Sequence, residues 1–359
     1  MPASIGREKL RRLSRGIPTV ENVWYGRSAG NIVVRAALWP LSKAYDVAMS
    51  ARTRLYDAGV LHTAVPALPT ISVGNLTVGG TGKTPFAAFL ATELSRRGKP
   101  AIALRGYGGD EVHVHRLLNP GMAVVVNSDR SAAIRDAKGQ GAEVVVLDDA
   151  FQHRRIARNA DVVLLSAEQL LRPRRMLPAG PWREPLAAAR RADLLVITRK
   201  TATIIDAERA AAAVRAEVPD VRIAMVHLTP SALVNAKDGT SMPLDSLRGS
   251  DVVAVAAIGE PELFKLQLEA LGASVRLEAY RDHHAYSADD VAEIRQLAMP
   301  DGMVVCTLKD AVKLAPLWPG PTGLWYLSQQ LVVDQGVEDV HRLLTRVLDA
   351  RAATPTSAG

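Results

Sequence analysis

Residues 71–85, ISVGNLTVGGTGKTP, lead from a short apolar run into a glycine-rich turn that ends in Gly82-Lys83-Thr84. Glycines let successive backbone N–H groups converge on phosphate oxygens. Lys83 can reach the terminal phosphates, and the Thr84 hydroxyl can hold Mg²⁺. A helix predicted at 84–97 would direct its positive dipole end at the same anion. The stretch therefore predicts a phosphate-binding loop in an enzyme that uses a nucleoside triphosphate.

Thr77 occupies the first glycine position of the G-x-x-x-x-G-K-[ST] pattern. The alternative interpretation is a glycine-rich turn that binds nothing. The order of apolar strand, loop, Lys-Thr pair and amphipathic helix favours a nucleotide site. The expected nucleotide contacts are Gly79, Gly80, Thr81, Gly82, Lys83, Thr84 and Pro85.

Beyond the loop, short runs of Val, Leu and Ile alternate with helical segments. Strands are predicted at 101–105, 122–126, 143–147, 161–165 and 193–198, with a helix at 130–138. After a boundary near 199–203 come helices at 205–218, 261–271, 288–297 and 337–348, and strands at 221–227, 252–257, 274–279 and 303–306. This alternation predicts an α/β fold of the P-loop NTPase type. We expect a mostly parallel sheet with helices on both faces, and a second, smaller α/β domain.

Composition and charge indicate the redox compartment of the protein and the class of partner it binds. The chain has 359 residues, 44 Lys+Arg against 37 Asp+Glu, and one cysteine, Cys306, in an apolar run. A lone cysteine in such a run predicts a buried thiol in a reducing compartment. Arginine-rich clusters near 7–15 and 172–191 fit nucleic acid, anionic lipid or a solvated face. Few aromatic residues accompany them, so we expect no nucleic-acid partner. We expect neither a signal peptide nor a membrane-spanning helix.

Residues 31–55 predict an amphipathic helix. At about 100° per residue, one side gathers Arg35, Ser42, Lys43, Asp46, Ser50, Thr53 and Arg54, and the other Val34, Ala37, Leu38, Leu41, Ala44, Tyr45 and Ala48. Trp39 falls near the polar border, and Pro40 is expected to kink the helix. The pattern alone fits equally well a helix packed on the core and a monotopic anchor on a membrane surface.

Two groups of polar residues are candidates for chemistry. Asp148 and Asp149 end an apolar strand, where parallel sheets bind their ligands. One of them could coordinate Mg²⁺ opposite Thr84, the alternative being a pair of helix-capping aspartates. Phosphoryl transfer to a hydroxyl also needs a group that orients or deprotonates the acceptor. Asp110 and His283 are candidates, although sequence spacing alone does not bring them together.

Taken together, segments covering most of the chain resemble the tetraacyldisaccharide 4′-kinase (lipid A 4′-kinase) family. They are WYGR at 24–27, VGNLTVGGTGKTP at 73–85, RGYG at 105–108, GDE at 109–111, DDAFQHR at 148–154, LPAGPWREP at 177–185, IGEP at 258–261, DH at 282–283 and TLKDAVK at 307–313. Thr77 is the family's own form of the loop. The chain departs from the family at Val112, where proline is usual, at Ala150, where glycine is usual, and in lacking the segment that usually precedes GDE. Ala150 would disfavour any positive φ needed there.

The resemblance implies an ATP-dependent kinase that transfers the γ-phosphate to the 4′-hydroxyl of tetraacyldisaccharide 1-phosphate, giving lipid IVA in lipid A biosynthesis. Asp110 with His283 would activate that hydroxyl, and Lys83 would hold the ATP phosphates. Thr84, Asp148 and Glu184 would surround Mg²⁺, supported by Asp149 and Arg183. Arg105, Tyr107, Arg130 and His153 would contact the glycolipid head group or its 1-phosphate.

The resemblance also implies a peripheral, monotopic enzyme on the cytoplasmic side of the bacterial inner membrane. Its partners would be the glycolipid substrate and anionic lipid, with no obligate protein partner evident. The expected division is 1–22 as a basic extension, 23–60 as a membrane-associating helical segment, 61–200 as the P-loop kinase domain, 201–350 as a second α/β domain completing the active-site cleft and 351–359 as a disordered tail.

Two alternatives belong to other classes. A P-loop GTPase or metallochaperone-type NTPase would need a base-reading [NT]-K-x-D segment. The stretch at 307–310 is similar, but Lys309 and Asp310 are adjacent, so the spacing is wrong. A non-catalytic ATP-binding protein of the membrane surface would have no need of Asp110, Glu184 and His283.

Overall fold

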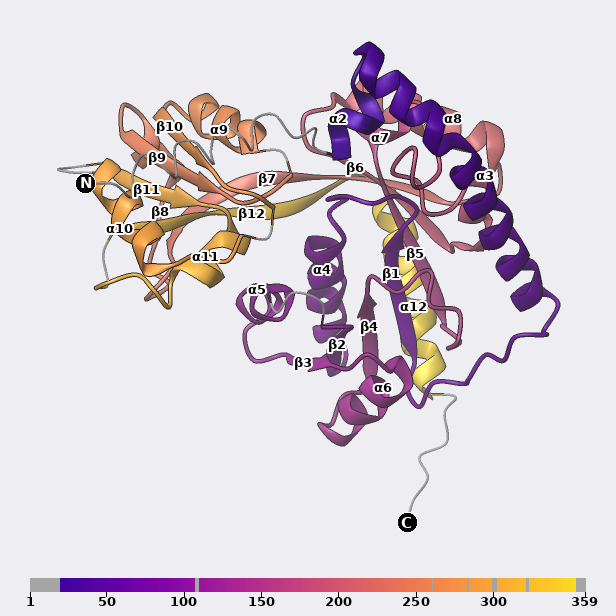
Figure 1. Ribbon diagram of the computed structural model, residues 1–359. Helices are drawn as coiled ribbons and strands as arrows, with labels where there is room; N and C mark the ends of the chain where they lie inside the picture. The colour runs from indigo at the N-terminus through magenta and orange to yellow at the C-terminus, as the bar shows by residue number, and fades with distance from the viewer. Residues whose placement is uncertain are drawn as a thin grey trace.

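The structure, a computed structural model, describes residues 20–106, 110–259, 261–282, 284–298, 302–320 and 323–352. Figure 1 shows two lobes, each a layered arrangement of helices on strands, joined by two long strands. One 12-stranded sheet runs through both lobes. The predicted α/β fold with a mostly parallel sheet is therefore confirmed.

The first lobe contains the predicted phosphate-binding loop. Its strands are β1 (Thr70–Asn75), β2 (Pro100–Leu104), β3 (Ala123–Val126), β4 (Val144–Asp148), β5 (Ala160–Ser166) and β6 (Leu194–Arg199), in the order β6-β5-β1-β4-β2-β3. Its helical segments are α4 (Lys83–Ser95), α5 (Asp110–Leu118), α6 (Arg130–Gly139), α7 (Ala167–Leu170), η1 (Leu186–Arg191), α8 (Ile204–Glu217) and α12 (Val337–Ala352). Because β1 pairs in parallel with β4 and β5, the carboxyl ends of all three strands meet at one edge.

The second lobe repeats the layered arrangement on a smaller scale. Its strands are β8 (Ser241–Met242), β9 (Asp251–Ala256), β10 (Ser274–Ala279) and β11 (Met303–Cys306), and its helical segments are η2 (Leu244–Leu247), α9 (Pro261–Ala270), α10 (Ala288–Leu297) and α11 (Leu308–Leu314). The two joining strands are β7 (Ile223–Asn235) and β12 (Leu324–Gln335), which pair antiparallel. At its ends this ribbon continues in parallel, β7 with β6 and β12 with β11.

Hydrophobic contacts cross the predicted domain boundary near 199–203. In the first lobe's core, Val340 and Val347 of α12 pack with Phe86 and Leu90 of α4 on one face of the sheet. On the opposite face α8 packs against β6, in a hydrophobic cluster that also includes Val163 and Leu165 of β5. The terminal helix thus returns to the first lobe, so both lobes depend on residues beyond 200. The division into domains stays a prediction.

Three elements near the site were not expected from the sequence. These are α5, α11 and β12, and β7 also runs beyond the predicted strand 221–227 to Asn235. In β12 polar residues such as Gln329 and Gln330 interrupt the apolar pattern, since part of the ribbon is exposed between the lobes. In α5 the fully buried position is a histidine, His115, which hides the helical periodicity. Cys306 is buried and free, as predicted.

Helix α3 (Ala29–Asp57) lies along the outside of the first lobe, after the short helix α2 (Val20–Tyr25) (Figure 1). It continues through Pro40 as one helix. Part of its polar side contacts the protein: Ser42, 5% exposed, donates to the Met176 carbonyl at 3.1 Å and accepts from the Ala179 N–H at 3.0 Å. Arg35 Nη1 donates to the carbonyls of Val23 in α2 and of Gly26 just after that helix, each at 2.7 Å.

Several large apolar side chains of α3 are exposed. Val33, Trp39, Leu41 and Val47 are between 59% and 69% exposed. The packed side of the helix mixes polar and apolar residues, since Leu38, Tyr45 and Met49 are half-buried beside Ser42, so the choice between a core-packed helix and a membrane anchor stays a prediction. No helix in the described ranges is both long and apolar enough to cross a bilayer.

Candidate active site

The phosphate-binding loop connects the carboxyl end of β1 to the first residue of α4. Gly82 precedes the helix with φ 80°, a left-handed conformation that glycine adopts without steric cost. No side chain caps the start of α4. The first N–H groups of a helix lack intrahelical partners, so this end presents unpaired donors and a positive dipole to an anion.

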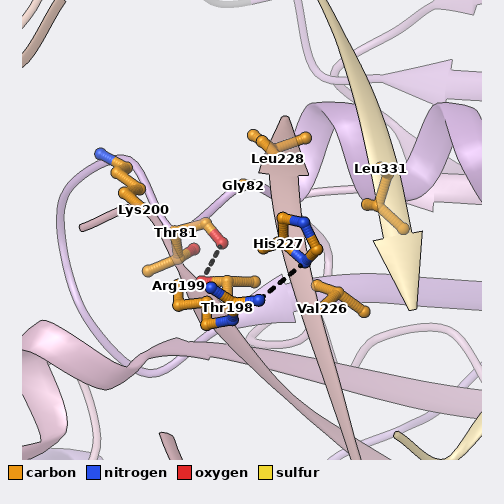
Figure 2. Close-up of a pocket in the computed structure, with 9 residues that line it drawn as sticks. All are labelled: Thr81, Gly82, Thr198, Arg199, Lys200, Val226, His227, Leu228 and Leu331. Carbon is orange, nitrogen blue, oxygen red and sulfur yellow. Dashed lines mark hydrogen bonds between the residues drawn. The ribbon is translucent and has the colours of Figure 1, made fainter. Parts of the chain in front are cut away.

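Side-chain hydrogen bonds brace the loop. Asn75 Nδ2 donates to Thr81 Oγ1 at 3.0 Å, and Thr198 Oγ1 donates to the Thr81 carbonyl at 3.0 Å (Figure 2). Thr77 is fully buried, and its hydroxyl donates to Gln169 Oε1 at 2.6 Å. A hydroxyl at this position therefore anchors the entry of the loop, which accounts for Thr77 where other loops carry glycine.

A small pocket lies beside the loop, between β6, β7 and β12. Figure 2 shows its lining: Thr81, Gly82, Thr198, Arg199, Lys200, Val226, His227, Leu228 and Leu331. Arg199 Nη2 lies 3.1 Å from His227 Nδ1, and both residues bond Asp334. These contacts tie β6, β7 and β12 together next to the loop. None of the three residues was predicted, because they meet only through strand pairing.

Glu168 holds the segment that follows β6. Its Oε1 accepts the backbone N–H groups of Lys200, Thr201 and Ala202 at 2.9–3.0 Å. Burial opposes its ionisation, but these three donors outweigh burial and hold the pKa of Glu168 at about 2. The carboxylate is therefore charged at neutral pH and fixes the 200–202 turn.

Asp148 lies at the carboxyl end of β4, directly beside the loop. Its Oδ2 accepts from Thr84 Oγ1 at 3.1 Å and lies 2.9 Å from His115 Nε2. Burial raises the pKa of Asp148, but the hydrogen bond and charge of His115, with Lys83 and Thr84, bring that pKa below its ordinary value. Its Oδ1 is buried and has no hydrogen-bond partner among the described residues.

These groups fit Mg²⁺. The ion takes oxygen ligands and is usually bound by one or two carboxylates together with substrate phosphates. The partnerless Asp148 Oδ1 and the Thr84 hydroxyl supply such oxygens beside the loop. No cluster of three His, Cys, Asp or Glu side chains suited to a metal occurs within the described ranges.

Asp149 has φ 51°, the only positive φ of a non-glycine residue in the part of the chain that the structure describes. Its Oδ1 lies 3.6 Å from Lys83 Nζ and 3.3 Å from Arg183 Nη1. A left-handed aspartate is uncommon, and such strain concentrates at functional sites. The positive φ thus falls on Asp149, not on Ala150, so the alanine there carries no such strain.

Glu184 is buried, at 1% exposure, and pairs with an arginine that the sequence did not single out. Its Oε2 accepts from Arg191 Nη2 at 2.6 Å, and the Arg191 guanidinium lies 4.4 Å from the centroid of the Phe151 ring. Glu184 Oε1 is buried without a partner in the described ranges. Among the described residues, no hydrogen bond joins Glu184 to Thr84 or Asp148. The assignment of Glu184 to the metal site stays a prediction.

Three of the four predicted head-group residues, Arg105, Arg130 and His153, are described and lie close enough for their charges to interact. Arg130 is 2% exposed, and its Nη2 donates to the Asp148 carbonyl at 2.8 Å while its Nη1 has no partner among the described residues. Burial, and then the charges of Arg130, Arg155, Arg158 and Arg105, lower the pKa of His153. The charges of Arg105 and Arg130 thus act on His153, and the assignment of these residues to the head group stays a prediction.

The predicted acceptor base begins α5. The structure places the Asp110 backbone but does not describe its side chain, and Tyr107 and His283 lie outside the described residues. Burial, followed by the nearby charge of Asp148, raises the pKa of the adjacent Glu111. The start of α5 therefore lies close to Asp148. Helix α11 packs against α5.

The TLKD stretch at 307–310 has a structural role. Asp310 is fully buried and accepts from Thr307 Oγ1 at 2.7 Å, the Ala257 N–H at 3.1 Å and Tyr286 Oη at 3.0 Å. With its carboxylate used in this way, Asp310 cannot read a guanine base. This removes the one segment that resembled a GTPase signature.

Comparisons with known proteins agree on one family. A family model described as tetraacyldisaccharide-1-P 4′-kinase (LpxK) matches residues 34–122 and 108–349. A tetraacyldisaccharide 4′-kinase from Halorhodospira halophila is 37% identical over 334 residues, spanning 87% of this chain and 93% of that protein. The namesake from Bdellovibrio bacteriovorus is 32% identical over 341 residues, 88% of this chain and all of that protein. A crystal structure of LpxK from Aquifex aeolicus in complex with ATP matches with a TM-score of 0.70 and 29% identity, covering 88% of this chain and 99% of that one.

Proposed function

We propose a lipid kinase reaction for this chain, which belongs to the tetraacyldisaccharide-1-P 4′-kinase family. The γ-phosphate of ATP passes to the 4′-hydroxyl of tetraacyldisaccharide 1-phosphate and gives lipid IVA, a step of lipid A biosynthesis. One observation carries the proposal: Thr84 and Asp148 are hydrogen-bonded beneath an uncapped helix N-terminus, and Asp148 Oδ1 is left open.

The donor side follows from the loop. Backbone N–H groups at the start of α4 bind the phosphates, and Lys83, held near Asp149 at 3.6 Å, contributes a cation. Thr84 and Asp148 would hold Mg²⁺, which neutralises phosphate charge when bound. Glu184 would support this set from its ion pair with Arg191. Preorganised charge of this kind favours the transition state because it needs no rearrangement during transfer.

The acceptor side rests on Asp110 and His283. A sugar hydroxyl is a weak nucleophile, so a carboxylate held by an imidazole would orient it and take its proton. In support of this pairing, Lys309 on α11 lies close enough to Glu111, the residue after Asp110, for its charge to act on the Glu111 carboxylate. Lys313 Nζ of the same helix donates to the His284 carbonyl at 3.3 Å, next to His283. Arg105, Tyr107, Arg130 and His153 would receive the head group or its 1-phosphate.

The apolar side of α3 supports peripheral attachment to a membrane. Exposed Val33, Trp39, Leu41 and Val47 would enter the lipid interface. The anionic surface would attract basic residues such as Arg172, whose guanidinium lies 4.5 Å from the centroid of the Tyr25 ring at the end of α2. We assign the enzyme to the cytoplasmic side of the inner membrane, where ATP is available to a lipid substrate.

The test is to incubate the protein with γ-labelled ATP and tetraacyldisaccharide 1-phosphate in detergent micelles, with and without Mg²⁺. We expect Mg²⁺-dependent label in the lipid, and weaker competition by unlabelled GTP than by unlabelled ATP. Label appearing only in inorganic phosphate would mean an NTPase, and ATP binding without turnover would mean a non-catalytic binding protein.

A further inference from the structure

His115 is a buried histidine that none of the functional assignments above uses. It lies in α5 with no solvent exposure, and its Nε2 is 2.9 Å from Asp148 Oδ2. Its other ring nitrogen, Nδ1, is also buried and has no hydrogen-bond partner among the described residues. Among the described residues, this side chain therefore makes one polar contact, with Asp148.

Packing alone does not account for a histidine here. The same side of α5 packs Val112 against the core of the first lobe, and an apolar side chain at 115 would fill the space without stranding a nitrogen. The other buried polar residue on this side, Asn119, is bonded to α4 through the Ala88 carbonyl and Thr92 Oγ1. Asn119 joins two helices, whereas His115 reaches the strand end that carries Asp148.

The contact determines which carboxylate oxygen stays open. Asp148 Oδ2 receives both Thr84 Oγ1 and His115 Nε2, while Oδ1 receives no donor from the described residues. The terminal torsion of an aspartate is broad and nearly two-fold, so one hydroxyl contact alone leaves the two oxygens free to exchange. A second donor on the same oxygen removes that freedom.

We propose that His115 is a positioning residue for the metal: it holds Asp148 so that Oδ1 points toward Mg²⁺·ATP. The inference rests on the proposed kinase function and adds a residue to its metal site. Groups that orient metal ligands in this way commonly contribute about 10- to 100-fold to metal affinity. His115 acts through Asp148 and does not touch the substrate.

The test compares His115→Leu with His115→Gln, whose amide N–H₂ can donate to Asp148 in place of the imidazole. Val114→Ala, at a buried neighbour on the same helix, is the matched control for disturbed packing. Binding of a fluorescent ATP analogue is measured in EDTA and across a Mg²⁺ titration, and Mn²⁺ binding in the presence of ATP is followed by electron paramagnetic resonance.

We expect His115→Leu to raise the half-saturating metal concentration about tenfold or more, with binding in EDTA unchanged. His115→Gln should restore most of the metal affinity, and Val114→Ala should leave it at the wild-type value. If His115→Leu does not fold, His115→Met, which is flexible enough to fill irregular gaps, takes its place.

The inference is overturned if the apolar variant titrates like wild type, if His115→Gln is no better than the apolar variant, or if binding in EDTA falls equally. Lipid phosphorylation by the wild type is measured in parallel. Failure of the wild type to phosphorylate the lipid counts against the proposed function. Unchanged metal dependence in an active enzyme counts against His115 alone.

Discussion

We call the end of the sheet beside the phosphate-binding loop, where Asp148 lies, the loop edge. The loop edge buries polar atoms that have no partner among the described residues, whereas helix α3 exposes apolar side chains. At the loop edge, polar atoms such as Asp148 Oδ1, Glu184 Oε1 and Arg130 Nη1 are buried without partners among the described residues. On α3, Leu41 and Val47 are 60% and 69% exposed. A buried polar atom without a partner and exposed apolar side chains are both unfavourable, which is why we propose a binding partner for each region.

The two regions differ in how their binding energy is distributed. At the loop edge we expect a few charged and hydrogen-bonding groups to contact the transferred phosphate, so a single substitution should have a large effect on the rate. On α3 the contribution is spread over many side chains and depends on area, so each substitution should have a smaller effect. Five expected outcomes sharpen this contrast, beginning with the largest.

Asp110→Asn should lower kcat about 10²- to 10⁴-fold with ATP affinity nearly unchanged, because the general base is lost while the phosphate loop is intact. Steady-state kinetics of lipid phosphorylation and ATP-analogue binding measure both quantities. Combining it with His283→Ala should add little if the two residues work as a unit. Unaltered kcat in Asp110→Asn would end its assignment, and the exposed Asp136→Asn serves as control.

Lys83→Ala should reduce lipid phosphorylation about 10²- to 10³-fold while the protein stays folded, because the transferring phosphate loses a preorganised cation. Initial rates and circular dichroism follow activity and fold. Lys99→Ala, an exposed lysine elsewhere in the same lobe, is the control. A Lys83→Ala rate near that of wild type would contradict the phosphate-loop assignment.

The pair Leu41→Glu and Val47→Glu should release the protein from anionic vesicles. Burying one such side chain contributes about 1.5–3 kcal/mol, so each change should weaken vesicle binding about tenfold or more. Vesicle co-sedimentation measures this, and binding of ATP should be unchanged. Leu266→Glu, at a leucine 57% exposed on α9, is the matched control. Equal loss in the control would show that added charge, not α3, is responsible.

Glu168→Gln should lower the free energy of unfolding by about 2 kcal/mol at neutral pH, because three backbone donors lose a charged acceptor. The pKa of Glu168 is lowered from 4.5 to about 2, so the carboxylate stabilises the fold above pH 4.5. That contribution is lost as the pH falls from 4.5 through 2. Denaturation at about pH 7, 5, 4 and 3 should show the difference between the proteins shrinking. A constant difference would rule out the carboxylate as its source.

Ser42→Ala should lower the free energy of unfolding by about 1 kcal/mol, because the buried Ala179 N–H loses its acceptor and α3 loses a hydrogen bond to the rest of the protein. Thermal unfolding measures the change, with Ser50→Ala on the same helix as control. Vesicle binding should persist, since the apolar side of α3 is untouched. An unchanged melting temperature would mean that α3 is held mainly by other contacts.

The local features of the loop edge follow from residues close together in the chain. The loop, its Lys83-Thr84 pair and the strand that delivers Asp148 are all predicted by local sequence patterns, and the fold confirms the parallel sheet around them. Glycine conformations and runs of apolar residues are encoded within a few positions, and they suffice for such predictions.

The partners across the fold do not follow in the same way. His115 meets Asp148 from 33 residues away, and Thr84 meets it from 64. Arg191 lies in an arginine-rich stretch, and nothing local distinguishes a buried guanidinium from a solvated one. Helix α5 could not be predicted either, because its fully buried position is a histidine, His115, inside a charged segment.

By itself, the sequence determined that this protein binds phosphate at the end of a parallel strand and that residues 31–55 form a helix with two unlike sides. Both are local properties of backbone conformation and residue period. Only the tertiary structure decided that Asp148 has one oxygen bonded and one open among the described residues, and that Ser42 of α3 faces the protein. Those outcomes depend on groups distant in the chain, such as Met176 beside Ser42, because a side chain's surroundings are set by packing and not by its neighbours in sequence.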